Sequence, residues 1–265
     1  MRTLSLIFLL IGGIALFSCN AIRRDIDHPE WQAVFDTLDV KGSIIIQNYT
    51  DEEVHVYNPD RIDRAFSPAS TFKIPHSLIA LQTGAVKDTS EVIPWDSVTR
   101  SIANWNHDHT MHTALPQSVV WFYQETARRI GQDSLRAYMD MFRYGNRDTS
   151  GRVDLFWLRG GLRITSREQI EFLRKLYFEL LPVDVANQKI VKDLLLLEEG
   201  PDYTLYGKTG WDTSKEKRHR GWIVGWVEKG EKVYFYATHI DIKEPSDAVK
   251  RLQVTRKVME ELGIM

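Results

Sequence analysis

Residues 67–75, SPASTFKIP, constrain the fold and chemistry of this chain more than any other stretch. They hold Ser70 and Lys73 in the spacing S-x-x-K, so a helix that opens at the serine carries both side chains on one face, one turn apart. A serine hydroxyl is a weak nucleophile until a base takes its proton, and a lysine amine acts as that base only where apolar surroundings lower its pKa. Phe72 and Ile74 flank the lysine and favour such surroundings. S-x-x-K also recurs by chance at ordinary helix starts, so other motifs in the chain have to show whether Ser70 and Lys73 are a catalytic pair.

The first 18 residues have the composition of a signal peptide. A positive start precedes an apolar run over residues 4–17, which is too short and too lightly flanked for a transmembrane helix. Residues 16–19, LFSC, resemble a lipobox, in which Cys19 becomes the lipidated first residue of a bacterial lipoprotein. We favour lipidation because Cys19 is the only cysteine, and a lone thiol is a liability in an oxidising compartment. The alternative is an ordinary signal cut after Ala21, and both predict a periplasmic protein, whose membrane contact is through the lipid anchor alone.

Length and charge narrow the class of protein. The 265 residues allow one sizeable core or two lobes that share an interface. The net charge of −2 argues against a nucleic-acid-binding protein, because there is no basic excess to neutralise phosphates. We predict a signal peptide over residues 1–18, a tether over 19–38 that contains a short helix at about 29–37, and one folded domain over 39–265.

Strand patterns lie near both ends of this domain, with helical patterns between them. The expected strands are 42–49, 54–57, 204–208, 221–228 and 232–240. The expected helices are 70–82, 119–130, 132–142, 167–178 after a cap at Ser166, 185–197, and 247–262 after a cap at Ser246. This order predicts an α+β fold. An antiparallel sheet forms from both chain ends, about 39–66 and 202–265, and is flanked by helices, with an inserted helical lobe over about 67–201.

Three further motifs and a basic residue fit the Ser70–Lys73 hypothesis. Residues 208–210 read K-T-G at the end of an expected strand; the cation and hydroxyl suit a substrate carboxylate, and the glycine lets a substrate lie close to the backbone. Ser118 heads an expected helix and offers a second hydroxyl. Residues 144–146, Y-G-N, form a tight turn, and Arg251 on the last helix suits bidentate binding of an anion. Each motif is weak alone, but their order along the chain is a strong signal.

These ordered motifs resemble the class D β-lactamases, the oxacillinases, within the serine β-lactamase and penicillin-binding protein superfamily. The resemblance covers roughly Asp39 to the C-terminus and is carried by residues 70–84, 118–124, 144–150, 156–158 and 221–225. One departure is His76, where many members carry asparagine; it lies beyond the reacting atoms. The resemblance implies a β-lactamase/transpeptidase-like fold and hydrolysis of a small-molecule β-lactam by a monomer or homodimer.

The resemblance also implies that a modified lysine takes part in the reaction. Ser70 attacks the β-lactam carbonyl and forms an acyl-enzyme. Lys73 is N-carboxylated by carbon dioxide or bicarbonate, and its carbamate is the general base for acylation and deacylation, with no metal and no other cofactor. Only an uncharged amine reacts with carbon dioxide, which agrees with the apolar residues that flank the lysine. Trp157 matches the family tryptophan whose indole N–H holds the carbamate.

The remaining roles follow from the same resemblance. Ser118 relays a proton to the lactam nitrogen beside Lys208. The backbone N–H groups of Ser70 and Trp211 form the oxyanion hole, where one donor is typically worth about 3 kcal/mol in the transition state. The residues expected around the substrate carboxylate are Lys208, Thr209, Gly210, Trp211 and Arg251.

Alternatives to the hydrolase are a penicillin-binding transpeptidase or carboxypeptidase, which deacylates slowly, and a β-lactam sensor domain, which is acylated and signals. For Tyr144 and Asn146 we expect a structural role. Four residues resemble metal ligands, but their spacing does not bring all of them together on one strand or one helix, and we expect them to be structural or surface residues. They are His107, Asp108, His109 and His112.

Overall fold

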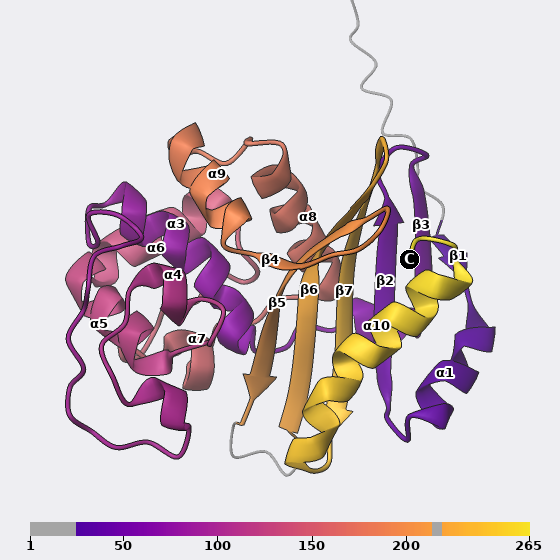
Figure 1. Cartoon of the computed structure of the whole chain (residues 1–265), viewed down its shortest axis with the longest axis horizontal. Helices are drawn as coiled ribbons and strands as arrows, with labels where there is room; N and C mark the ends of the chain where they lie inside the picture. Colours follow the sequence, from indigo (N-terminus) through magenta and orange to yellow (C-terminus); the bar gives the residue numbers. More distant parts are fainter. Residues whose placement is uncertain (1–24, 214–218) are drawn as a thin grey trace, which may run out of the picture.

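A sheet built from the two ends of the chain is the centre of the fold (Figure 1). The structure, a computed structural model, describes residues 25–213 and 219–265. Within these residues seven strands pair in the order β1-β3-β2-β7-β6-β5-β4, and every neighbouring pair is antiparallel except β1 with β3. The strands are β1 Asp25–Asp27, β2 Gly42–Asn48, β3 Glu53–Tyr57, β4 Leu196–Glu199, β5 Thr204–Asp212, β6 His219–Lys229 and β7 Lys232–Ile242. The predicted α+β class and the sheet formed from both chain ends are confirmed.

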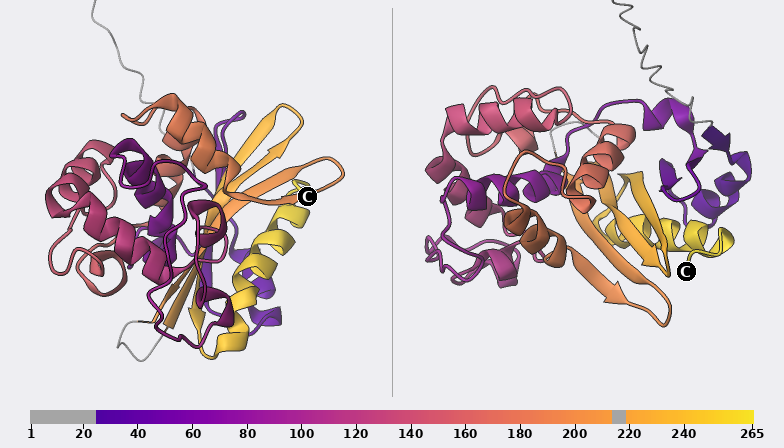
Figure 2. Two further views of the ribbon diagram at one scale, coloured as in Figure 1. Left: turned by 60° about the vertical axis from the view of Figure 1, so that its left-hand side comes forward. Right: turned by 90° about the horizontal axis from the view of Figure 1, so that it is seen from above.

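Helices cover both faces of the sheet and also form a lobe beside it. In Figure 1, α10 crosses one face near α1, and α8 packs on β6 and β7. Helices α3 to α7 gather beyond β5 (Figure 2). The α-helices are α1 Gln32–Thr37, α2 Pro59–Ile62, α3 Lys73–Gln82, α4 Met111–Ala114, α5 Val120–Ile130, α6 Gln132–Phe142, α7 Phe156–Arg159, α8 Ser166–Tyr177, α9 Val185–Asp193 and α10 Lys250–Glu261; the 3-10 helices are η1 Pro29–Trp31, η2 Ala69–Phe72, η3 Ala103–Trp105 and η4 Pro245–Val249. In the part of the chain that the structure describes, none of these helices has the length and apolarity to cross a bilayer.

Strand β2 separates two hydrophobic cores. All seven of its residues are buried, and successive side chains of a strand point to opposite faces of the sheet. Ile44 and Ile46 join the core that contains buried residues of α1 and α10, whereas Ile45 joins the core shared with α8 and the helical lobe. A strand that is buried on both faces favours consecutive β-branched residues, which accounts for the three isoleucines in a row.

The short helix expected over residues 29–37 is present, but a tether is wrong from residue 25 onward, because this segment is folded. Strand β1 pairs with β3, and residues 29–37 form η1 and α1. Trp31 and Phe35 are 2% and 0% exposed, and the Phe35 ring stacks on Tyr57 with centroids 4.6 Å apart. Burial of these large aromatic surfaces is what holds the segment against the sheet. Residues 1–24, with the predicted signal and Cys19, lie outside the described residues, so export and lipidation stay predictions.

Several element boundaries differ from the predicted ones. The helix expected over 185–197 ends at Asp193, and residues 196–199 instead form the edge strand β4. The last helix begins with η4, which Glu244 caps in place of the expected Ser246, and α10 follows from Lys250. Thr165 rather than Ser166 caps α8. Strand β5 continues to Asp212, because its pairing with β6 extends that far, so K-T-G lies inside the strand and not at its end.

Candidate active site

Ser70 lies on a tight turn that leads into a helix. Residues 69–72 form η2, and α3 begins at Lys73. The Lys73 Nζ donates a hydrogen bond to Ser70 Oγ at 2.8 Å, so the two groups meet as the S-x-x-K spacing predicts. Ala69, directly before the serine, has φ +47°, a left-handed conformation that residues other than glycine rarely adopt and that clusters at functional sites.

The Lys73 amine lies in a dry, apolar setting. Its side chain is fully buried, and so are the flanking Phe72 and Ile74. The Tyr123 ring centroid is 5.3 Å from Nζ. Burial holds the pKa of Lys73 well below 10.5, and the charge of Lys208 lowers this pKa further. The amine is therefore neutral over a pH range in which an exposed lysine is charged.

Trp157 lies on α7, packed against the residue that precedes this lysine. Its ring stacks on Phe72 with centroids 5.5 Å apart, and the side chain is 0% exposed. The buried Nε1–H has no hydrogen-bond partner among the described residues. A buried donor without an acceptor costs about 1–3 kcal/mol. The indole N–H is thus suited to an acceptor that belongs to the reacting groups.

His76, where the chain departs from the family pattern, packs in the layer next to Trp157. Its ring packs edge-on against the rings of Trp157 and Tyr123, with centroids 5.3 and 5.1 Å away. The Nε2 atom shares a hydrogen bond with Thr126 Oγ1 at 3.1 Å. Burial lowers the pKa of His76 to about 3, with a further contribution from the charge of Lys73, so the ring is neutral at neutral pH. His76 lines no part of the cleft described below and acts as a packing residue.

Ser118 and Lys208 form a second pair of functional groups. Ser118 precedes α5 with φ +55°, and its Oγ accepts a hydrogen bond from Lys208 Nζ. The Lys208 side chain comes from β5 and also donates to the Thr209 carbonyl at 3.0 Å. Burial lowers the pKa of Lys208 to about 7, and the charge of Arg251 adds to this effect. Near neutral pH, Lys208 can therefore either give a proton to the serine or take one from it.

Strand β5 comes very close to the nucleophile turn. A Cβ placed on Gly210 would lie 2.9 Å from the Pro68 carbonyl oxygen and 3.3 Å from the Thr71 nitrogen. These are backbone atoms that cannot swing away, so only glycine permits this approach. The contact places the strand of K-T-G directly beside Ser70.

Arg251 joins the site from α10. Its Nη1 donates to the Gly210 carbonyl at 3.4 Å. Burial lowers the pKa of Arg251 to about 10, which leaves the guanidinium charged at neutral pH. Trp211, the next residue along β5, lies beside it in the cleft, and its indole N–H has no hydrogen-bond partner among the described residues. Arg251 and Trp211 thus line the same end of the cleft.

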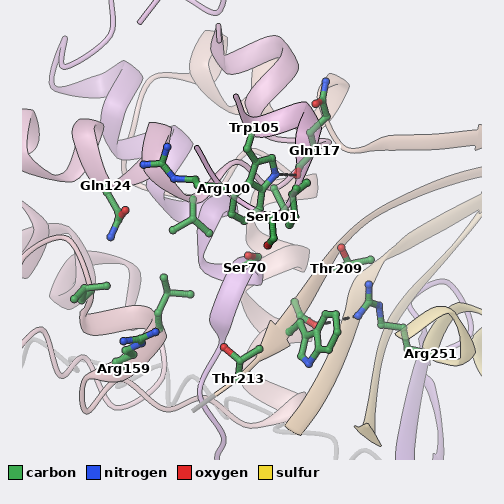
Figure 3. Close-up of a pocket in the computed structure, with 17 residues that line it drawn as sticks. Ser70, Arg100, Ser101, Trp105, Gln117, Gln124, Arg159, Thr209, Thr213 and Arg251 are labelled. Atoms are coloured by element: carbon green, nitrogen blue, oxygen red, sulfur yellow. Dashed lines mark hydrogen bonds between the residues drawn. The ribbon is translucent and has the colours of Figure 1, made fainter. Parts of the chain in front are cut away.

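A cleft of about 770 Å³ opens onto Ser70 between strand β5 and the helical lobe (Figure 3). It brings together Ser70, Ser118 and Arg251, while Lys73, Lys208 and Trp157 lie behind its surface. The motif segments also contribute Val120, Gln124 and Leu158 to its wall. The lining residues that the motifs did not single out are Arg100, Ser101, Ile102, Trp105, Gln117, Leu155, Arg159 and Thr213. Most of them come from irregular segments that carry no periodic signal, although Arg159 directly follows the 156–158 motif.

Tyr144 and Asn146 line no part of this cleft. Asn146 Nδ2 donates to the Gly161 carbonyl at 2.9 Å, and its Oδ1 accepts from the Arg163 N–H at 2.9 Å. The Tyr144 hydroxyl donates to Gln169 Oε1 at 3.5 Å, and the Gln169 amide donates to Thr71 Oγ1 at 2.8 Å. The two residues brace the turn and, through Gln169, the segment next to Ser70, which supports the structural role expected for them.

The histidine cluster of residues 107–112 has hydrogen-bond partners of its own. His109 is buried, and its ring nitrogens pair with Thr113 Oγ1 and the Asn104 carbonyl, both at 2.9 Å. Across residues 25–213 and 219–265, no three His, Cys, Asp or Glu side chains group in a way that would hold a metal ion.

Comparison with known proteins identifies the family. The family model of the penicillin-binding protein transpeptidase domain matches residues 39–260. β-Lactamase OXA-48 from Klebsiella pneumoniae is 42% identical over 263 residues, covering 99% of this chain and 98% of the relative. β-Lactamase OXA-5 from Pseudomonas aeruginosa is 35% identical over 268 residues, covering 100% and 99%.

Solved structures agree with the sequence relatives. The crystal structure of the class D β-lactamase YbXI from Nostoc has a TM-score of 0.87 at 38% identity, covering 90% of this chain and 100% of that one. The class D β-lactamase FUS-1 from Fusobacterium nucleatum has a TM-score of 0.87 at 31% identity, covering 91% and 100%. Matches of this extent and identity, together with the paired Ser70 and Lys73, show that the chain belongs to the class D family of serine β-lactamases.

Proposed function

We propose that this protein hydrolyses β-lactams through an acyl-enzyme on Ser70, with N-carboxylated Lys73 as the general base. The observation that carries the proposal is the 2.8 Å hydrogen bond between the Lys73 amine and the Ser70 hydroxyl, in a buried setting that lowers the pKa of the amine and so favours its neutral form. A serine needs a neighbouring base to become a nucleophile, and burial favours the neutral form of a lysine that can serve as that base.

The surroundings of Lys73 fit the carboxylated form. Carbon dioxide reacts only with a neutral amine, and the burial of Lys73 favours that state. The Nε1–H of Trp157, which has no partner among the described residues, is a donor in the same buried layer, and a carboxylate needs such a donor when it leaves water. When present, the carboxylate on Lys73 supplies the base that accepts the proton of Ser70 and later that of water.

The lactam nitrogen is the leaving group, and it receives its proton from the pair formed by Ser118 and Lys208. Ser70 Oγ forms a bond to the lactam carbonyl carbon, the C–N bond of the lactam breaks, and its nitrogen must gain a proton. Ser118 supplies that proton, and Lys208, whose pKa is about 7, restores it. Water then adds to the ester carbon, the bond to Ser70 Oγ breaks, and the ring-opened acid leaves.

Two further groups act on the substrate itself. The backbone N–H groups of Ser70 and Trp211 form the oxyanion hole, which is supported by the close approach of Gly210 to the nucleophile turn. Arg251, Lys208 and Thr209 bind the ring carboxylate at this end of the cleft, where the two cations lie within reach of one another. The resulting orientation places the lactam carbonyl over Ser70.

Turnover separates this proposal from its two alternatives. Purified protein mixed with an excess of a penicillin is expected to consume many equivalents at steady state, measured by loss of the lactam absorbance. Mass spectrometry of the same samples reports the acyl-enzyme. A single stoichiometric burst that leaves a stable acyl-enzyme would instead assign a β-lactam sensor or a slowly deacylating transpeptidase.

Activity is expected to depend on bicarbonate, most strongly at acid pH. The folded pKa of Lys73 lies below its unfolded value, so the amine is neutral above the lowered pKa and gains a proton as the pH falls through it. Since the protonated amine cannot hold carbon dioxide, we expect the steady-state rate on a penicillin to fall towards acid pH and to recover on addition of bicarbonate. The control is the same pH profile in carbon-dioxide-depleted buffer; identical profiles with and without bicarbonate would rule out the carboxylated lysine.

A further inference from the structure

The cleft borders a second cavity that is rich in arginine. This cavity has a volume of about 180 Å³ and shares Leu158 and Arg159 with the cleft. Its charged lining residues are Arg64, Arg159, Arg163, Arg220 and Asp212. Four guanidinium groups and one carboxylate line this small volume, in a chain whose net charge is −2, and the Asp148 carboxylate lies near Arg163. Such a cavity favours an anion.

Two of these arginines pack against the aromatic ring of Phe66. The guanidinium carbons of Arg64 and Arg220 lie 5.3 and 5.1 Å from the ring centroid of Phe66, which also lines the cavity. The His239 ring also stacks on Phe66, with ring centroids 4.1 Å apart. The pKa of His239 is well below 6.5, first because it is buried and then because of the charges of Arg61, Arg220 and Arg64.

Arg159 is the member of this group that reaches the substrate cleft. It is exposed at the end of α7, two residues after Trp157. Among residues 25–213 and 219–265, no carboxylate forms an ion pair with it. In the view of Figure 3, Arg159 and Arg251 lie on opposite sides of Ser70. The cleft therefore carries a cation at each end, with the nucleophile between them.

The chemistry of a β-lactam matches this layout. Its ring carboxylate lies on the nitrogen side of the scissile carbonyl, and its acyl side chain is attached to the carbon on the other side. If the ring carboxylate is bound by Arg251, the side chain extends from Ser70 towards Arg159. A negative group on that side chain would meet a guanidinium, which pairs well with a carboxylate.

We propose that Arg159, with Arg64 behind it, forms a subsite for a carboxylate on the acyl side chain, so that the enzyme favours dianionic over monoanionic β-lactams. This inference rests on the proposed function, since it assumes that the ring carboxylate occupies the Arg251 end. The carboxylate on the acyl side chain is a feature of the substrate that the groups taking part in the reaction do not recognise.

Benzylpenicillin and its α-carboxy derivative form a matched pair of substrates, because they differ only in the side-chain carboxylate. The measured quantity is the ratio of kcat/KM for the dianion to kcat/KM for the monoanion. We expect Arg159→Gln to lower this ratio about two- to fivefold, the range that a partly exposed ion pair supports. Arg159→Glu is expected to lower the ratio further, whereas Arg159→Lys is expected to retain part of the preference for the dianion. Arg64→Gln is expected to lower the ratio by less than Arg159→Gln does.

The control is Arg136→Gln, which removes an exposed arginine of α6 that lines neither cavity. It is expected to leave the ratio unchanged, and added salt should lower the wild-type ratio towards that of Arg159→Gln. An equal ratio in wild type, Arg159→Gln and Arg136→Gln overturns the subsite. If wild type is acylated without turnover, the proposed function fails, but the same ratio of acylation rates, read by mass spectrometry, still tests the subsite.

Discussion

The Lys73→Ala variant is expected to retain penicillin as a long-lived acyl-enzyme and to lose turnover by a factor of about 10²–10⁴, the usual contribution of a general base. Ser70 loses the group that lies 2.8 Å from its hydroxyl, and the water that should release the product loses its base. Acylation still proceeds slowly, because the oxyanion hole and the carboxylate-binding groups remain in place. Steady-state rates and mass spectrometry of the trapped adduct report the two half-reactions separately.

Two companion variants make this result specific. Lys73→Met keeps the length and apolar volume of the side chain, so it separates the loss of the amine from the loss of packing. Lys87→Ala removes an exposed lysine on the surface and is expected to behave as wild type. Thermal unfolding of each variant verifies that it is folded. Undiminished turnover in Lys73→Met would exclude any role of this lysine as the base.

Trp157→Phe is expected to lower activity about 10- to 100-fold in air-equilibrated buffer and to recover on addition of bicarbonate. The substitution keeps an aromatic ring against Phe72 but removes the buried N–H that has no partner among the described residues. A hydrogen bond to a charged group is worth about 1.5–3 kcal/mol, which corresponds to this loss in the occupancy of the carboxylated lysine. Bicarbonate restores the occupancy by mass action.

The chain offers a matched control for this variant. Trp226 is 1% exposed, and its indole N–H also lacks a partner among the described residues, but its ring stacks on Tyr206 in the sheet and lines no part of the cleft. Trp226→Phe is expected to change stability alone. If bicarbonate affects the Trp157→Phe and Trp226→Phe variants equally, Trp157 does not support the modified lysine.

The motifs predicted which residues lie together because each is a local pattern with a fixed consequence. The S-x-x-K spacing brings Ser70 and Lys73 together within one turn, and the apolar flanks of the lysine correspond to its observed burial. Strand patterns at both chain ends likewise predicted the sheet. Its edge strand β4 was missed, because a short segment after α9 becomes a strand only by pairing with β5, which follows it after residues 200–203.

The N-terminal cap of α8 is another feature that the local sequence does not determine. Thr165 and Ser166 are both residues that cap helices, and each has Glu or Gln three residues later, so local sequence does not choose between them. The tertiary structure decides: the Gln169 amide donates to Thr71 Oγ1 and supports the nucleophile segment, which leaves Glu168 to complete the capping box with Thr165. Most residues that line the cleft could not be predicted either, because they come together from loops that lie far apart in the chain.

The close contact between Gly210 and the nucleophile turn has a consequence for how this enzyme can change. The floor of the cleft is held by backbone atoms on both sides, so a side chain cannot be enlarged there without separating the strand from Ser70. The rim, by contrast, is formed by side chains such as Arg159 and Thr213, which can vary without moving the reacting groups. New substrate preferences are therefore accessible by substitutions at the rim, while the chemistry of the floor stays the same.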